Sequence, residues 1–462
     1  MSELSVLPAL PVLDRRRSGV LLHPAALPGE HGAFGRAARS FIDWLAAAGF
    51  GVWQVLPLGP VGADGSPYWL RSDQAGNPLL IDRSEAPNPD ESRAAFEQFC
   101  AEQRSWLEDY VLFAALSREH AAAPWWTWAE PLRDRDPQAL RAVRERLSPE
   151  LHSLRVEQWQ FAVQWHALRE YARERGVALY GDLPIYVAPD SVATWSQRSQ
   201  FQLSEMGSPR LQAGVPPDYF SADGQLWGNP LYDWEQGRRD GFAYWRSRIA
   251  SALQRFDLLR LDHFRGLAGY WAVPAGARTA REGEWLPAPG EALLAALTAA
   301  LGPLPMVAED LGVITPDVVA MRRAYDMPGM RVLQFGFDGH DANVHIAYNL
   351  THRDVVYTGT HDNDTTLGWY RSLEPATARR VDDYFGTSAA QMPEAMVRAA
   401  LASVAVLAVV PVQDLLSLGS EARYNLPGTV GNNWCWRMDE GALTAGLAAR
   451  YRALNDIFGR SA

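Results

Sequence analysis

Lysine is absent from the 462-residue sequence, so its 43 cationic side chains are all arginines. A phosphate-binding loop that ends in Gly-Lys-Ser/Thr requires the lysine ε-amine, and so does a Schiff base with pyridoxal phosphate or a carbonyl substrate. The missing lysine therefore excludes Walker-type nucleotide hydrolases, protein kinases and Schiff-base enzymes.

Cysteine is scarce, and long apolar runs are missing. Cys100 and Cys435 are the only cysteines and have no C-x-x-C spacing, which predicts neither a zinc ribbon nor a disulfide framework and favours a reducing compartment. The first residues place their arginines after a short apolar stretch, the reverse of an export signal. The longest apolar run, 399–412, is shorter than the roughly 20 residues that span a bilayer. We expect a cytoplasmic protein without membrane contact.

The chain is acidic overall. With 43 cationic and 54 acidic side chains, its formal net charge is −11 at pH 7. Nucleic acids and anionic membranes bind clustered cations, so neither is an expected partner, and an uncharged or cationic ligand fits better. A chain of this length could form two or three domains, or one α/β barrel with insertions.

Short apolar strands alternate with helical stretches, which is the sequence pattern of βα units and a parallel sheet. We expect eight strands, at 19–23, 52–56, 79–82, 177–183, 258–262, 306–310, 355–360 and 407–414. The strand at 79–82 is the weakest of them, and 332–338 is a ninth candidate. This pattern favours one catalytic (β/α)8 TIM barrel domain spanning 1–462. Inserts between barrel strands would form subdomains and loops around the active-site cleft, at about 83–153, 188–235 and 266–290.

Three carboxylates, Asp262, Glu309 and Asp362, each stand at the end of a predicted strand. The carboxyl ends of all strands in a parallel barrel open on one face, so distant residues can converge there. One protonated and one ionised carboxyl group can together cleave a glycosidic bond, with retention when they lie about 5 to 5.5 Å apart. A third could hold the sugar hydroxyls. Alternatively, the three acids cap the following helices or pair with arginines.

Arg260 precedes Asp262 by two residues, so both lie on the same face of their strand. An arginine there would keep the aspartate ionised, as a nucleophile requires, although it could also form a purely structural ion pair. His263 and His361 each adjoin one of the acids. The sequence has no H-E-x-x-H, H-x-H or zinc-type cysteine cluster, so we expect hydrogen-bond donors rather than metal ligands here.

Several aromatic side chains lie in segments predicted to be loops, where core packing is not the first explanation: Tyr68, Trp69, Tyr219, Phe220, Trp227, Tyr270 and Trp271. Pyranose rings stack their apolar faces on aromatic side chains, and acids and amides bind their hydroxyls. A sugar ligand therefore accounts together for the acids, the aromatic side chains and the low density of cationic side chains. Other tryptophans lie on apolar helical or strand faces and are predicted to be core residues: Trp44, Trp53, Trp106, Trp159 and Trp165.

Longer sequence segments are more specific than any single residue. They are, in order, GVLLHPAALPGEHG, SPYWLRSDQAGNPLLID, YGDLPIYVAPDSVATW, GVPPDYFSADGQLWGNPLYDW, LLRLDHFRG, VAEDLGVITPDV, YTGTHDNDT and PVQDLLSLGSEARYNLPGTVGNNWCWR. Together they resemble the amylomaltases or disproportionating enzymes, the 4-α-glucanotransferases of glycoside hydrolase family 77. The resemblance runs from about Gly19 to Arg437. Two positions depart from the family pattern, with Trp69 where glutamine is usual and Tyr424 where methionine is common.

This resemblance implies a (β/α)8 barrel without metal or organic cofactor that acts on α-1,4-glucans, such as maltooligosaccharides and fragments of starch or glycogen. It implies that Asp262 is the nucleophile, Glu309 the general acid/base, and Asp362 the stabiliser of a distorted donor sugar. It places further substrate-binding residues at the donor sugar, namely Tyr68, Asp182, Arg260 and His361. It places others in a flexible loop on the acceptor side, within 215–231, namely Asp218, Phe220 and Trp227.

Two other functions fit parts of the pattern. An α-1,4-glucan hydrolase of the α-amylase clan would use the same three carboxylates but release its product to water, and only the loop from PPDYF to LWGNP favours transfer. A catalytically inactive glucan-binding barrel is the second alternative. The intact set of Asp262, Glu309 and Asp362 disfavours it.

Overall fold

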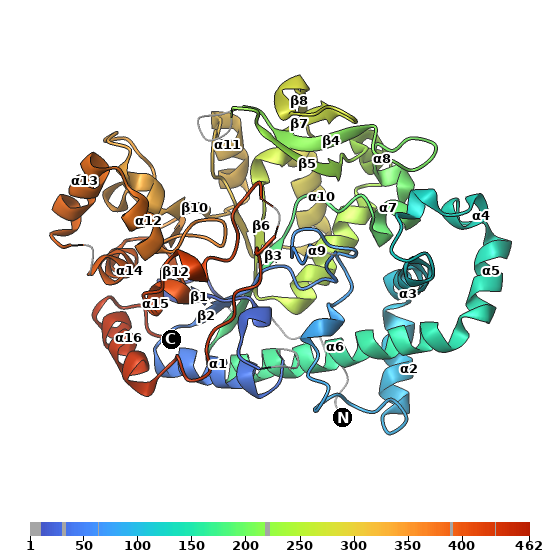
Figure 1. Cartoon of the computed structure of the whole chain (residues 1–462), viewed down its shortest axis with the longest axis horizontal. Coiled ribbons are helices and arrows are strands. Elements are labelled where there is room, and N and C mark those ends of the chain that lie inside the picture. Colours follow the sequence, from blue (N-terminus) through green and yellow to red (C-terminus); the bar gives the residue numbers. More distant parts are fainter. Residues whose placement is uncertain (1–10, 30–33, 63, 218–221, 389–390, 430) are drawn as a thin grey trace.

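The computed structural model describes residues 11–29, 34–62, 64–217, 222–388, 391–429 and 431–462 (Figure 1). Eight parallel strands form a closed barrel, which confirms the predicted fold class. Around the barrel they follow the order β1 (Arg17–Leu21), β12 (Leu407–Pro411), β11 (Asp354–Tyr357), β10 (Gly329–Val332), β9 (Met306–Ala308), β6 (Leu258–Leu261), β3 (Ala178–Leu183) and β2 (Val52–Gln54). The pairing of β1 with both β12 and β2 completes the ring.

Two of the expected strands were wrong. Residues 79–82 do not form a strand, because Pro78 begins a 3-10 helix (η2, Pro78–Leu80) that the Asn77 side chain caps by accepting from the Leu79 amide. The ninth candidate, 332–338, overlaps the true strand β10 only at Val332, and its apolar residues continue as a 3-10 helix (η7, Leu333–Phe337). Strand β10 was overlooked because Arg331 interrupts its apolar pattern.

The barrel strands are buried on both faces, which explains their nearly continuous apolar sequences. Alternate side chains point toward the barrel axis and form one core cluster that includes Leu21, Val52, Tyr180, Val307, Met330, Val355, Tyr357, Leu407 and Val409. The intervening side chains point outward and pack against the helices in a second, larger cluster. The polar side chains of Ser18, Arg260 and Arg331 interrupt this apolar pattern within β1, β6 and β10.

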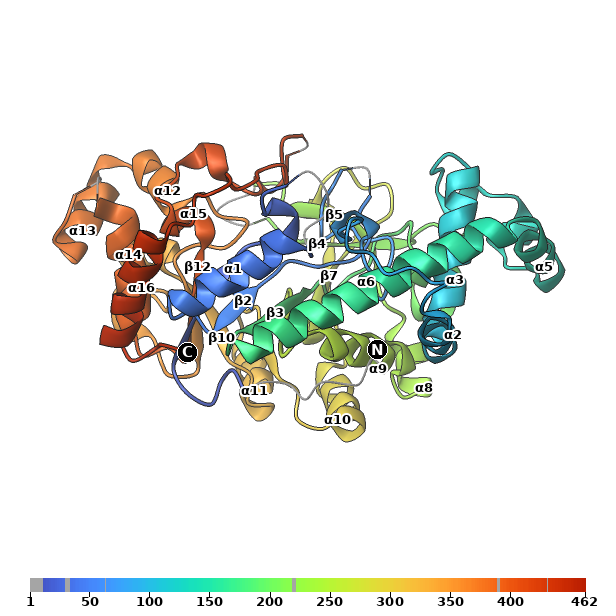
Figure 2. The ribbon, with the colours of Figure 1, turned by 90° about the horizontal axis from the view of Figure 1, so that it is seen from below.

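Helices surround the barrel on the outside: α1 (Arg36–Ala47), α6 (Ser148–Glu174), α9 (Ala243–Arg255), α10 (Gly290–Leu301), α11 (Pro316–Ala324), α14 (Met392–Ala402) and α16 (Ala445–Ile457). Figure 2 shows α6, the 27-residue helix, running from beside α1 out to a peripheral group of helices. That group comprises α2 (Arg93–Glu102), α3 (Arg104–Glu119), α4 (Glu130–Arg133) and α5 (Pro137–Arg146) and has an apolar core of its own.

The remaining inserts contribute shorter elements. These are α7 (Val192–Ser196), α8 (Trp234–Arg239), α12 (Thr366–Ser372), α13 (Pro375–Phe385) and α15 (Val412–Leu415). Among the described residues, no helix has both the length and the apolar character needed to cross a membrane. Cys100 and Cys435 are both free thiols.

A second, antiparallel sheet lies beside the barrel (Figure 1). Its strands lie in the order β5 (Gln225–Pro230), β4 (Leu211–Val215), β7 (Gly269–Pro274) and β8 (Glu284–Pro287). Residues 225–230, which carry Trp227, were expected in a loop, and so was the Tyr270–Trp271 pair. Both are instead strand residues, because two inserts pair with each other through β4 and β7.

Arg460, close to the C-terminus, binds main-chain groups near two barrel strands. Its side chain is 0% exposed. The guanidinium donates to the carbonyl oxygens of Leu401 at 2.6 Å, Arg17 at 2.6 Å, Ser403 at 2.8 Å and Ala405 at 2.9 Å. Burial is the main reason why the pKa of Arg460 is lowered to about 9. These bonds connect the start of β1 to the segment before β12, where the barrel closes.

We expect Arg460→Met to reduce the free energy of unfolding by about 3 kcal/mol, because it leaves buried carbonyl groups without donors. Arg452→Met is the matched control, since Arg452 is 44% exposed and pairs with Asp456 at the surface. The control should change stability by no more than about 0.5 kcal/mol. Denaturant or thermal unfolding of the two variants checks this, and equal effects would contradict the role of Arg460.

Candidate active site

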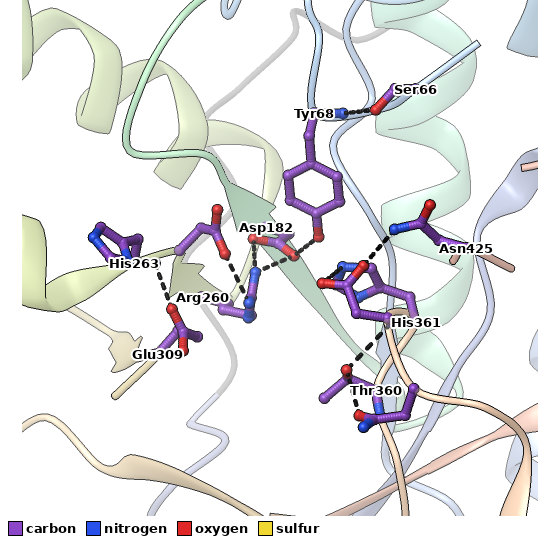
Figure 3. A network of polar contacts seen from close by, with 12 residues as sticks. Ser66, Tyr68, Asp182, Arg260, His263, Glu309, Thr360, His361 and Asn425 are labelled. Atoms are coloured by element: carbon purple, nitrogen blue, oxygen red, sulfur yellow. Dashed lines mark hydrogen bonds and ion pairs between the residues drawn. The ribbon is translucent and has the colours of Figure 1, made fainter. Parts of the chain in front are cut away.

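The predicted site residues from four barrel strands come together at the carboxyl ends of those strands. Asp182 lies in β3 and Arg260 in β6, with Asp262 directly after β6. Glu309 directly follows β9, and the loop after β11 carries His361 and Asp362. Figure 3 shows the polar contacts around Asp182, Arg260, Glu309 and His361. Parallel-barrel enzymes build their active sites on this face.

Arg260 is the central cation of the network. Strand pairing places it opposite Asp182, and its Nη1 lies 2.8 Å from both carboxylate oxygens of that residue. Its Nη2 lies 2.8 Å from Oδ1 of Asp262, as expected for two residues on the same strand face. The arginine is buried, so these ion pairs are poorly screened by water. Arg260 therefore holds two carboxylates from neighbouring strands in fixed positions.

Glu309 is buried beside this cation, and main-chain amides hold its carboxyl group. The His263 N–H donates to Oε2 at 2.7 Å, and the Leu311 N–H donates to Oε1 at 2.9 Å. Burial is the largest effect on Glu309 and raises its pKa to about 7, although Arg260 and the two amides lower this pKa; the negative charge of Asp262 adds a smaller increase. Because His263 directly follows Asp262, one peptide unit links the two acids.

Asp362 has a different environment. Its side chain is 48% exposed, and its carboxylate lies 3.4 Å from Nε2 of His361. Asn425 donates from Nδ2 to its Oδ1 at 2.6 Å. Burial of the group acts to raise the pKa of Asp362, but the His361 ring and the hydrogen bonds from His361 and Asn425 outweigh it and lower this pKa well below its usual range. Asp362 therefore remains ionised at neutral pH.

Tyr68 connects the Asp182 side of the site to the Asp362 side. Its hydroxyl donates to Oδ2 of Asp182 at 2.6 Å. Its ring stacks on His361, with centroids 5.0 Å apart and an interplanar angle of 16°. Burial, followed by the negative charge of Asp182, raises the pKa of Tyr68 well above its ordinary value, so the hydroxyl keeps its proton.

Of the residues predicted on the acceptor side, the structure describes only Trp227. Trp227 on β5 packs edge-to-face against His263, with ring centroids 4.8 Å apart. This contact brings the second sheet to the residue that follows Asp262. Asp218 and Phe220, the other two residues predicted on this side, lie outside the described residues.

Sequence reasoning overlooked two residues of the site. Asn425 is hydrogen-bonded to Asp362, and Trp434 packs on Tyr68 and His361 with ring centroids 6.0 and 5.9 Å away. Both lie in the segment after β12, and no spacing rule connects that segment to acids on other strands. The only sequence signal for them was that both lie in the last segment that resembles glycoside hydrolase family 77, from Pro411 to Arg437.

A (β/α)8 barrel that carries a buried, protonatable carboxyl group and an arginine-paired carboxyl group at its carboxyl-end face is typical of enzymes that act on glycosidic bonds. The sequence matches the 4-alpha-glucanotransferase family, glycoside hydrolase family 77, over residues 22–91 and 83–444. The chain belongs to this family and is a transferase.

Relatives with this activity align along nearly the whole chain. The 4-alpha-glucanotransferase of Thermus thermophilus is 45% identical over 95% of this chain and 98% of its own. The enzyme of Synechocystis sp. is 43% identical, with coverages of 97% and 99%. Among solved structures, the amylomaltase from Streptococcus agalactiae in complex with acarbose has a TM-score of 0.92 and 33% identity, covering 97% of this chain and all of that one.

The hydroxyl of Tyr68 can be tested by Tyr68→Phe, which retains the ring. A hydrogen bond to a charged group contributes about 1.5–3 kcal/mol, so we expect kcat/KM for transfer to fall roughly 10- to 100-fold. Tyr370→Phe is the matched control, because the Tyr370 hydroxyl donates to Asp382 at the same 2.6 Å outside the site. A Tyr68→Phe enzyme as active as this control would show that the hydroxyl has no role in transfer.

Proposed function

We propose that this enzyme transfers α-1,4-glucan segments from a donor maltodextrin to the 4-hydroxyl of an acceptor glucan or glucose. The reaction would be a retaining double displacement in the cytoplasm. One observation carries the proposal: Glu309, with a pKa of about 7, lies next to Asp262, which is ion-paired with Arg260. A protonated acid beside an ionised carboxylate is the pairing that glycoside cleavage requires.

In the first step, the Asp262 carboxylate attacks the anomeric carbon of the donor sugar. The bond between that carbon and the glycosidic oxygen breaks, and Glu309 gives its proton to the departing oxygen. The products are a covalent β-glycosyl ester on Asp262 and a shortened glucan with a free 4-hydroxyl. Glu309 is then ionised, and the ester has removed the negative charge of Asp262.

In the second step, Glu309 accepts the proton of the acceptor 4-hydroxyl as that oxygen attacks the anomeric carbon. The ester bond breaks and Asp262 leaves as a carboxylate, so both acids return to their starting states. Two inversions restore the α-configuration. The carboxyl groups supply the acid, the base and the nucleophile, so the proposed reaction needs no metal or organic cofactor.

The other polar groups suit a distorted donor sugar. We assign Asp362, which stays ionised, to the sugar hydroxyls, with Arg260, His361 and Asp182 as further hydrogen-bond partners. Tyr68 provides an aromatic face for the ring. Trp227, together with Asp218 and Phe220, would bind the acceptor and keep water from the ester. The Streptococcus agalactiae amylomaltase was solved in complex with acarbose, which supports a sugar as the ligand of this chain.

Incubation with maltotriose tests the proposal. We expect glucose and maltodextrins longer than maltotriose to appear while the number of reducing ends stays constant, because each bond broken is formed again. An increase in reducing ends without longer products would identify a hydrolase instead. An Asp262→Asn enzyme should show neither product, because its amide cannot form the ester. Unchanged maltotriose with the unmodified enzyme would contradict the proposal.

The pKa of Glu309 predicts the pH dependence. Its raised value, about 7, keeps the acid protonated at pH 6, where an ordinary glutamate would be ionised. We therefore expect kcat/KM for maltotriose to fall as pH rises through about 7, which pH–rate measurements check.

The control for this pH dependence is Glu309→Gln with an α-glycosyl fluoride donor, whose leaving group needs no proton. The first step of this variant should proceed with fluoride release that does not decline around pH 7. A decline that persists in Glu309→Gln would assign the titration to another group.

A further inference from the structure

The segment that leads to Trp434 has an unusual main-chain conformation. Gly431, Asn432 and Trp434 have φ angles of +87°, +57° and +64°. Glycine and asparagine adopt this left-handed region readily, but for a side chain as bulky as tryptophan it is uncommon and costly. Residues held in such conformations are concentrated at functional sites, where the surrounding structure compensates for the strain.

Hydrogen bonds hold this turn in place. The Trp434 N–H donates to the carbonyl oxygen of Tyr424 at 2.6 Å. The Asn433 side chain accepts from the Leu426 N–H at 3.0 Å and donates to the Thr429 carbonyl oxygen at 3.0 Å. The direction of the Trp434 side chain is therefore determined by its main chain.

That direction brings the indole against two residues of the site. Its ring centroid lies 6.0 Å from that of Tyr68, at 43°, and 5.9 Å from that of His361, at 37°. Tyr68 and His361 also stack on each other at 5.0 Å. Tyr68, His361 and Trp434 thus form a three-ring cluster.

Each of the other two rings contacts an acid of the site. The Tyr68 hydroxyl lies 2.6 Å from Asp182, and Nε2 of His361 lies 3.4 Å from Asp362. Tyr68 lies between β2 and η2, far in sequence from β3, so the strand that carries Asp182 does not anchor the Tyr68 ring. Packing against the indole restricts the tilt of both rings.

We infer that Trp434 is a positioning residue for the donor pyranose. It holds Tyr68 and His361 in the stacked geometry in which they contact Asp182 and Asp362. The inference rests on the proposed function, since it assigns the donor sugar to these residues. A shift of about 1 Å at such a site can cost roughly 100-fold in rate.

The test compares variants of Trp434 in the transfer of glucosyl units from maltotriose. Trp434→Gly removes the indole but suits a positive φ, so it retains the turn without its strain. Trp434→Phe keeps a ring at the same place. Trp436→Ala is the matched control, because Trp436 lies two residues further on and packs on Tyr424, with centroids 5.6 Å apart, rather than on the site.

We expect Trp434→Gly to lose roughly 100-fold in kcat/KM, mostly in kcat, with a thermal midpoint within about 3 °C of the unmodified enzyme. Trp434→Phe should recover activity to within about tenfold, and Trp436→Ala should transfer at nearly the original rate. Recovery by a ring of the same class is a result that a general stabilising role does not predict.

Two results would overturn the inference. One is a Trp434→Gly enzyme that transfers as fast as Trp436→Ala. The other is a loss of activity in Trp434→Gly that occurs only together with a large fall in its thermal midpoint. Neither result would contradict the proposed function as long as the unmodified enzyme transfers glucan. An unmodified enzyme that cannot transfer would contradict the proposed function itself.

Discussion

The Arg260 guanidinium is the interaction on which the arrangement of the site depends. Asp182 and Asp262 belong to neighbouring strands, and the close approach of two carboxylates without a cation would be strongly unfavourable in a buried environment. Arg260 lies between them because strand pairing places it opposite Asp182, while alternation along β6 directs it to the side of Asp262. The positions of the acids therefore follow from the register of the barrel.

Glu309 and Asp362 differ in charge because their surroundings differ. Glu309 is enclosed by protein and lies near Asp262, so its protonated form is favoured. Asp362 is half-exposed and receives hydrogen bonds from Asn425 and His361, so its ionised form is favoured. The same chemical group can thus serve as proton donor in one position and as a permanent anion in another. Burial and hydrogen bonding, rather than residue type, assign these states.

Much of the fold could be predicted from the sequence because buried parallel strands are short, nearly continuous apolar segments followed by polar residues. Seven barrel strands followed this rule, whereas β10 did not. Arg331 breaks its apolar run and is accommodated by Asp310 and Asp354 on adjacent segments, a compensation that only the folded chain reveals. The run at 79–82 had the right composition, but Pro78 and the Asn77 cap determined its local structure.

The site was predictable to a similar extent. Strand ends identified Asp262, Glu309 and Asp362, and period-two alternation identified Arg260. Asn425 and Trp434 could not be derived in this way, because they reach the site from an irregular segment whose path depends on left-handed residues and side-chain hydrogen bonds.

The second sheet couples two inserts that are separate in sequence. Strands β4 and β5 come from the insert before β6, whereas β7 and β8 come from the insert after it, and the central pairing joins β4 to β7. If only one of these inserts were exchanged with a relative, β4 and β7 would come from different proteins and their paired edges would not match. Recombination between relatives therefore has to carry 211–287 as one block, and this block includes Asp262. The residues proposed for the acceptor side on β5 and the proposed nucleophile are in this sense inherited together.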